Sequence, residues 1–178
     1  MKRLLAMGCG LLVLGWANGM AAAPSPDTAS VDKAIVHLAP TKGNKVQGTV
    51  RFETVKGGVK VTADLTGLTP GKHGFHVHEK GDCSAPDGSS AGGHFNPTGQ
   101  AHGGPDATAR HEGDLGNLVA DASGAAHYER VDQQLTLQGP NSILGRSVVV
   151  HAKADDFKTQ PSGASGDRVA LGKIEPEK

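Results

Sequence analysis

The side chains of this chain that could do chemistry are mainly histidines. Two of them, His76 and His78, stand in the run Gly74–Glu79 with one valine between them. Side chains at positions i and i+2 of a β-strand face the same side, so both imidazoles would project together. Taken alone, such a pair fits two ordinary polar-face histidines better than a metal site.

Four further histidines and one aspartate extend the pattern. They occupy a glycine-rich segment and the ends of two candidate strands: His94, His102, His111, Asp114 and His151. Imidazole suits copper and zinc, and a mixed imidazole–carboxylate set suits tetrahedral zinc. Seven ligands are too many for one four-coordinate ion and suit two ions that share a ligand. No thiolate belongs to the set, which argues against iron–sulfur and blue-copper sites.

Three histidines stay outside this set. His37, His73 and His127 lack comparable neighbours in the sequence, so we expect them to be ordinary side chains.

The elements that must position the candidate ligands alternate with period two. Short alternating runs end at Gly, Pro or Asn, as at Gly57–Gly58 and Pro70–Gly71, which is typical of strands joined by turns. The predicted strands are 34–38, 46–52, 59–65, 74–79, 115–120, 125–131, 147–152 and 168–174. Eight short strands without a helical period predict an all-β fold, an antiparallel barrel or sandwich.

Two segments interrupt this rhythm. Residues 80–114 are rich in Gly, Pro and His, and residues 153–167 form a shorter polar segment. Loops of this length inside a compact domain are usually functional or disordered. Metal ligands would keep the first one ordered, so the sequence predicts two long functional loops.

The N-terminus has the pattern of an export signal. Lys2 and Arg3 precede an apolar run that is too short to span a bilayer, and small residues follow at Ala21–Ala23. We expect residues 1–23 to be a cleaved signal peptide, 24–31 a flexible lead-in and 32–175 the folded domain. The tail Glu175–Lys178 is expected to be disordered.

Composition narrows the function classes further. The 18 basic and 18 acidic residues balance, which argues against a general nucleic-acid binder. No membrane association is expected once the signal is removed.

Cleavage of the signal peptide would also remove Cys9 and leave Cys83 as the single cysteine. Disulfides persist in exported proteins, yet one cysteine cannot form an internal bridge.

Five motifs together resemble the copper/zinc superoxide dismutases over residues 31–174. They are Gly74–Glu79, Gly93–Pro97, His102–Pro105, Arg110–Asn117 and Gly145–His151. The lengths of segments 83–94 and 153–167 are similar to those of the periplasmic bacterial branch. The resemblance implies an eight-stranded antiparallel Greek-key barrel, copper and zinc as cofactors, superoxide as substrate and a periplasmic location. It leaves open whether the chain is a homodimer or a monomer.

The resemblance also implies roles for single residues. Copper would be bound by His76, His78, His94 and His151, and zinc by His94, His102, His111 and Asp114. His94 would therefore join both ions. Asp155 would orient His76 and His102, and Arg168 would attract and position superoxide beside copper. Copper would alternate between two oxidation states while zinc keeps its structural role.

One position departs from the family pattern. The family usually joins a cysteine of the long loop to a second cysteine three residues after the active-site arginine. Cys83 matches the first cysteine, but Leu171 occupies the second position. We expect no bridge, an apolar packing role for Leu171 and a loop that depends on zinc for its order. Asp167 is a candidate partner of Arg168.

Two other functions are alternatives. A non-catalytic copper/zinc-binding protein on the same barrel would not need Arg168, and a zinc hydrolase would keep one zinc position open to water. The complete ligand set together with Arg168 favours the dismutase.

Overall fold

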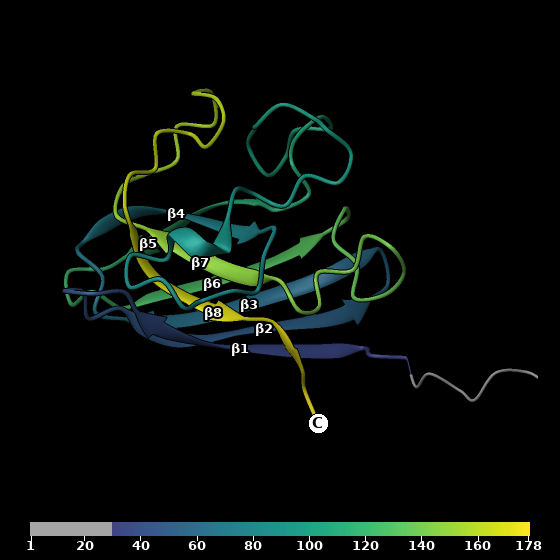
Figure 1. The fold of residues 1–178 in the computed structure, drawn as a ribbon, viewed down its shortest axis with the longest axis horizontal. Helices are drawn as coiled ribbons and strands as arrows, with labels where there is room; N and C mark the ends of the chain where they lie inside the picture. Colours follow the sequence, from purple (N-terminus) through teal and green to yellow (C-terminus); the bar gives the residue numbers. More distant parts are fainter. Residues whose placement is uncertain (1–29) are drawn as a thin grey trace, which may run out of the picture.

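The regular structure of this chain is almost entirely β-strand, as a computed structural model of residues 30–178 shows (Figure 1). The predicted signal peptide and the lead-in up to residue 29 lie outside the described residues. The strands are β1 Lys33–Pro40, β2 Gln47–Val55, β3 Gly58–Thr66, β4 Gly71–His78, β5 Asp114–Ala120, β6 Ala126–Asp132, β7 Ser147–His151, β8 Arg168–Lys173 and β9 Glu175–Pro176. A single 3₁₀ turn, η1 Ser89–Ala91, accompanies them in the described part. No helix in that part is long and apolar enough to cross a membrane.

The strands close on themselves as one antiparallel sheet. Their order is β2-β3-β6-β5-β4-β7-β8-β1-β9, and pairing of β1 with β2 joins the two ends. β3 pairs with β6 and β4 with β7, so several neighbours in space are distant in the chain, as in a Greek key. The predicted all-β Greek-key barrel is confirmed, and β1–β8 correspond to the eight predicted strands.

Alternation along each strand separates the core from the surface. In β1, Ala34, Val36 and Leu38 are buried while His37 is exposed. The inward residues of β1–β8 form one core that includes Phe52 and Phe75. β7 is buried along its whole length, because the long loop after β4 covers its outer side.

Two long loops lie over the same part of the barrel. One connects β4 to β5 and the other connects β7 to β8 (Figure 1). The second loop is tied to β4 because the Gly74 N–H donates to the Lys153 carbonyl at 2.8 Å. Both loops therefore reach the outer face of β4.

The expectation of a disordered tail is wrong. Glu175 and Pro176 form β9, which pairs with Ile35 and Ala34 of β1. The Glu177 N–H then donates to the Lys33 carbonyl at 3.0 Å. A proline is tolerated there because β9 is an edge strand, whose outward N–H has no partner to lose.

Candidate metal centre

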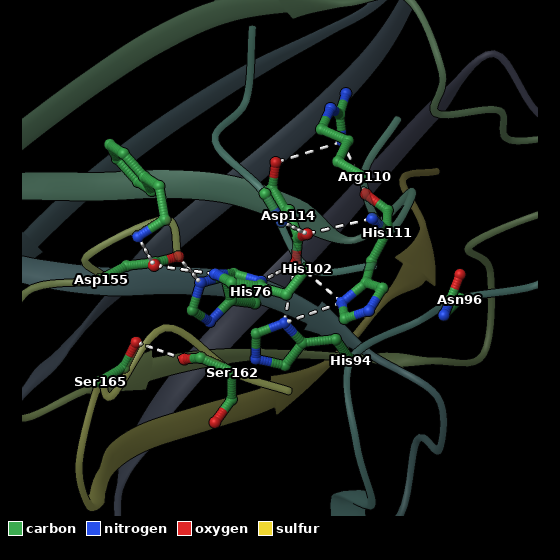
Figure 2. A network of polar contacts seen from close by, with 12 residues as sticks. His76, His94, Asn96, His102, Arg110, His111, Asp114, Asp155, Ser162 and Ser165 are labelled. Atoms are coloured by element: carbon green, nitrogen blue, oxygen red, sulfur yellow. Dashed lines mark hydrogen bonds and ion pairs between the residues drawn. The ribbon is translucent and has the colours of Figure 1, made fainter. Parts of the chain in front are cut away.

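Seven buried polar side chains meet where the two loops cover β4, β5 and β7. Figure 2 labels His76, His94, His102, His111 and Asp114 among them. They form two groups, and within each group the ligand atoms lie within 4.8 Å of one another. The first group is His76, His78, His94 and His151; the second is His94, His102, His111 and Asp114. His94 belongs to both groups.

Strand β4 positions the first two histidines. Phe75 and Val77 face the core, while His76 and His78 face the loops, with ring centroids 6.4 Å apart. His78 also forms an isolated antiparallel bridge with His94, which brings the long loop back onto β4. The period-two geometry of a strand therefore places both imidazoles on the loop-covered side.

Hydrogen bonds orient the imidazoles of the first group. The His78 Nδ1–H donates to the Gly92 carbonyl at 2.9 Å, and the His151 Nδ1–H donates to the Gly166 carbonyl at 3.2 Å. Their Nε2 atoms then face each other at 3.4 Å. Bonds of this kind fix the tautomer and leave the other ring nitrogen free as a ligand.

Asp114 organises the second group. Its Oδ2 accepts from the backbone N–H groups of Gly103 and His111, at 3.1 and 3.0 Å. Its Oδ1 lies 2.8 Å from His94 Nδ1, 3.1 Å from His102 Nδ1 and 3.2 Å from His111 Nδ1. One carboxylate oxygen and three ring nitrogens therefore converge on one spot.

The structure places Asp155 between the two groups. Its Oδ2 accepts from His76 Nε2 at 2.8 Å and its Oδ1 accepts from His102 Nε2 at 2.9 Å (Figure 2). The Asn117 side chain holds the Asp155 backbone with two hydrogen bonds of 3.0 and 2.7 Å. One carboxylate therefore orients one imidazole of each group.

The protonation states of the first group suit a metal. Burial lowers the pKa of His76 to about 3 and that of His151 to about 4. Burial likewise lowers the pKa of His78 well below its ordinary value. Neutral imidazoles keep a lone pair for a cation at neutral pH.

The second group holds a proton in the metal-free chain. Burial lowers the pKa of His102, but the carboxylates of Asp114 and Asp155, each close to one of its ring nitrogens, outweigh burial and raise that pKa to about 9. Burial alone would raise the pKa of Asp114, yet the close imidazoles of His102, His111 and His94 hold it well below its usual range. Metal binding at this group would therefore release a proton.

The donor set fits copper and zinc. Within residues 30–178, three buried ring nitrogens of the two groups have no hydrogen-bond partner: His76 Nδ1, His94 Nε2 and His102 Nδ1. An unpaired buried nitrogen is costly unless a bound group satisfies it. Imidazole-only and imidazole–carboxylate sets match the ligand preferences of copper and zinc.

Arg168 lies beside the first group and is half-buried. Its guanidinium donates to the carbonyls of Gly88 and Gly92, the second at 2.6 Å. Gly92 is the residue whose carbonyl also holds His78. In the described part of the chain Arg168 makes no ion pair with Asp167, so the anticipated pairing is not formed.

Leu171 takes an apolar role in the long loop, and Cys83 is free and exposed. Leu171 is buried against Ala91 and Val149, and a Cβ on Gly88 would lie 3.4 Å from Leu171 Cδ1. The loop residues that meet Leu171 are therefore Gly88 and Ala91.

The three remaining histidines lie outside both groups. His73 is buried, and its Nδ1–H donates to the His151 carbonyl at 2.8 Å. The exposed His127 pairs with Asp64 at 2.7 Å. Sequence analysis assigned no supporting role to His73 or Asn117, whose partners are 78 and 38 residues away.

Comparisons with known proteins identify the family of this chain. The family model described as copper/zinc superoxide dismutase (SODC) matches residues 46–174. An extracellular superoxide dismutase [Cu-Zn] of Brugia pahangi is 46% identical over 78% of this chain and 73% of its own length. The superoxide dismutase [Cu-Zn] of Paramecium bursaria Chlorella virus 1 is 45% identical over 82% of this chain and 80% of its own. That of Onchocerca volvulus is 46% identical over 76% and 92%, respectively.

A solved structure has the same fold. The crystal structure of the clock protein EA4 superimposes with a TM-score of 0.78 at 42% identity, covering 85% of this chain and 98% of that one. The chain belongs to the copper/zinc superoxide dismutase family of oxidoreductases, which bind copper and zinc.

Proposed function

We propose that this chain is an exported superoxide dismutase that converts superoxide to oxygen and hydrogen peroxide. The observation that carries the proposal is the pair of buried ligand groups that share His94, with Arg168 tied to one of them. Copper, when bound, supplies the alternating one-electron oxidation and reduction.

The two groups differ in their ligand types, and this difference assigns one metal to each group. The all-imidazole group would hold copper: His76, His78, His94 and His151. The group with a carboxylate would hold zinc in a closed structural site: His94, His102, His111 and Asp114. Asp155 would fix one ligand of each group.

Arg168 binds and orients the anionic substrate. Its two hydrogen bonds to loop carbonyls hold the guanidinium beside the His78 imidazole. Partial burial lowers the pKa of Arg168, but a guanidinium stays ionised at neutral pH. A fixed cation at this place attracts superoxide and aligns it before electron transfer.

His94 is the residue suited to carry a proton. Its Nδ1 faces Asp114, while its Nε2 is buried in the first group. This nitrogen would bind either copper or a proton, and a proton held there while it does not bind copper would pass to the departing peroxide. Burial lowers the pKa of His94, which favours that release.

The proposed location rests on the sequence. The pattern of residues 1–23 supports export, and the lengths of segments 83–94 and 153–167 support the periplasmic bacterial branch. One similar protein is named extracellular, whereas the three relatives named above are nematode and viral. We therefore infer a periplasmic enzyme that acts on superoxide without nucleic-acid or membrane partners, as a homodimer or a monomer.

The test is metal analysis together with a dismutation assay on the purified mature chain. We expect one copper and one zinc per chain and rapid loss of superoxide. A chain that binds both metals but does not accelerate dismutation would overturn the proposal in favour of a non-catalytic metal-binding protein.

A further inference from the structure

The side chain of Gln160 forms hydrogen bonds with the backbone of His102, a residue of the second ligand group. Its Oε1 accepts from the His102 backbone N–H at 2.8 Å, and its Nε2 donates to the His102 carbonyl at 3.0 Å. The Nε2 also donates to the Lys158 carbonyl at 3.3 Å. Gln160 lies in the loop after β7 and His102 in the loop after β4, 58 residues apart.

This pair of bonds replaces the pairing that a strand would provide. A carboxamide carries one acceptor and two donors, so it can satisfy a backbone N–H and C=O together. His102 lies outside any strand, and no backbone group in residues 30–178 bonds to its N–H or C=O. Gly103 and Gly104 follow it directly, and glycine loses more conformational freedom than any other residue when a loop is ordered.

The loop around Gln160 is itself held in shape. The Asp156 side chain accepts from the backbone N–H groups of Lys158 and Thr159, at 2.9 and 2.8 Å. The Gly163 N–H donates to the Thr159 carbonyl at 2.7 Å. The carboxamide therefore extends from an ordered turn.

The same loop holds the His102 side chain from the other side. Asp155 accepts from His102 Nε2 at 2.9 Å, which leaves Nδ1 facing Asp114 Oδ1 at 3.1 Å. The ring is thus oriented by Asp155 and its backbone by Gln160. The position of His102 Nδ1 therefore depends on both the Asp155 contact and the Gln160 contact.

We propose that Gln160 is a positioning residue for the zinc group, which it serves by fixing the backbone of His102. The proposal rests on the assignment of zinc to this group. It predicts that the loop after β7 governs how long zinc is retained, although that loop contributes none of the four ligands.

The experiment compares Gln160→Ala and Gln160→Glu with the wild-type chain. Zinc release to a chromogenic chelator is followed in the loaded protein, and the visible absorption of Co²⁺ substituted at the zinc group reports ligand geometry. Gln100→Ala is the matched control, because it removes the same kind of side chain from the loop of His102 without a side-chain hydrogen bond in the described residues. Hydrogen exchange of segment 98–104 in the metal-free protein measures the contact itself.

We expect Gln160→Ala to release zinc about 5- to 30-fold faster, the factor that one to two hydrogen bonds carry. The Co²⁺ spectrum should change and segment 98–104 should exchange faster. Gln160→Glu keeps the acceptor but sets a carboxylate oxygen against the His102 carbonyl, so it should also release zinc faster. Gln100→Ala should match the wild type.

Unchanged zinc release, Co²⁺ spectrum and exchange in Gln160→Ala would overturn the positioning role while leaving the proposed function intact. If the His111→Ala variant takes up zinc as well as the wild-type chain does, the assignment of zinc to this group is wrong. The role of Gln160 in zinc retention is then wrong as well. Exchange of segment 98–104 would then still report whether Gln160 holds His102.

Discussion

His94 faces Asp114 with one ring nitrogen, Nδ1 lying 2.8 Å from Oδ1, while its Nε2 is buried in the other ligand group without a hydrogen-bond partner in residues 30–178. One imidazole thus belongs to both groups. Replacing it should affect both metals at once, which no other ligand of the set should do.

We expect His94→Ala to lower both copper and zinc content and to abolish dismutation. Metal content by mass spectrometry and a superoxide assay check this, with His127→Ala, an exposed histidine outside both groups, as the control. A variant that keeps stoichiometric copper and zinc with normal activity would remove the shared role of His94.

Arg168 combines a charge with two bonds to loop carbonyls, and two variants separate these roles. Arg168→Ala should lower kcat/KM about 10-fold or more at low ionic strength and flatten its salt dependence, because screening acts on steering. Arg168→Lys keeps the charge but lacks the planar fork, so it should recover the salt dependence better than the rate.

Metal content should stay unchanged in both Arg168 variants, since neither removes a ligand. Arg51→Ala, an exposed arginine paired with Glu177, is the control. Equal rates and equal salt dependence in Arg168→Ala and the wild type would mean that Arg168 does not guide the substrate.

Gly163 lies so close to Asp155 that a Cβ there would overlap Oδ1 and approach His102 Nε2 to 2.7 Å. Gly163→Ala should therefore displace Asp155 and loosen both metal groups. Gly139→Ala is the matched control, because Gly139 has a similar φ of 75°, against 67°, but nothing within 4 Å.

Both alanine variants should carry the cost of a left-handed residue, about 1–2 kcal/mol. Only Gly163→Ala should also release zinc and copper faster to a chelator. If the two variants hold metal equally well, the tight packing of Gly163 on Asp155 has no role in the site.

Leu171 should stabilise the long loop in place of a disulfide. Leu171→Ala removes buried contacts with Ala91 and Val149, so the free energy of unfolding should fall by about 2–5 kcal/mol. Val119→Ala, at a side chain that is 59% exposed, should change it by less than about 0.5 kcal/mol.

The loop should consequently depend on metal and not on redox state. A reductant should leave Tm unchanged, whereas a chelator should lower it sharply, because metal binding contributes to folding. Differential scanning calorimetry measures both, and a metal-free protein that melts as high as the loaded form would contradict the dependence of the loop on metal.

The metal-free protein should lose stability as the pH falls from about 6.5 to about 4. The pKa of His76 is lowered to about 3 and that of His151 to about 4, so in this window the unfolded chain takes up protons that the folded chain does not. The raised pKa of His102, about 9, affects a different pH range. Its contribution to the free energy of unfolding is complete below pH 6.5 and is lost as the pH rises toward 9.

Urea midpoints across this range measure the effect. His151→Leu removes one of the buried imidazoles and should flatten the slope. A midpoint that is constant between pH 6.5 and pH 4 would contradict the assignment of neutral buried histidines.

Strand positions could be read from the sequence because side-chain alternation is a local property of the backbone. The runs that became β1, β2 and β3 showed it, and the same rule put His76 and His78 on one face of β4. β7 was recognisable instead as a short apolar run, because it is buried along its whole length. The sequence did not predict the short strand β9, because two residues that include a proline are too few to show an alternating pattern. The candidate ligands were visible as residue types in family motifs, which are also local.

Contacts across the chain could be decided only by tertiary packing. Gln160 meets His102 from 58 residues away, and His73 meets the His151 carbonyl from 78. Leu171 meets Gly88 and Ala91, whereas the sequence predicted only an apolar packing role without naming its partners. These pairs have no signature in the sequence, because each depends on how two irregular loops pack on the barrel, and that packing is set by the sum of many weak contacts.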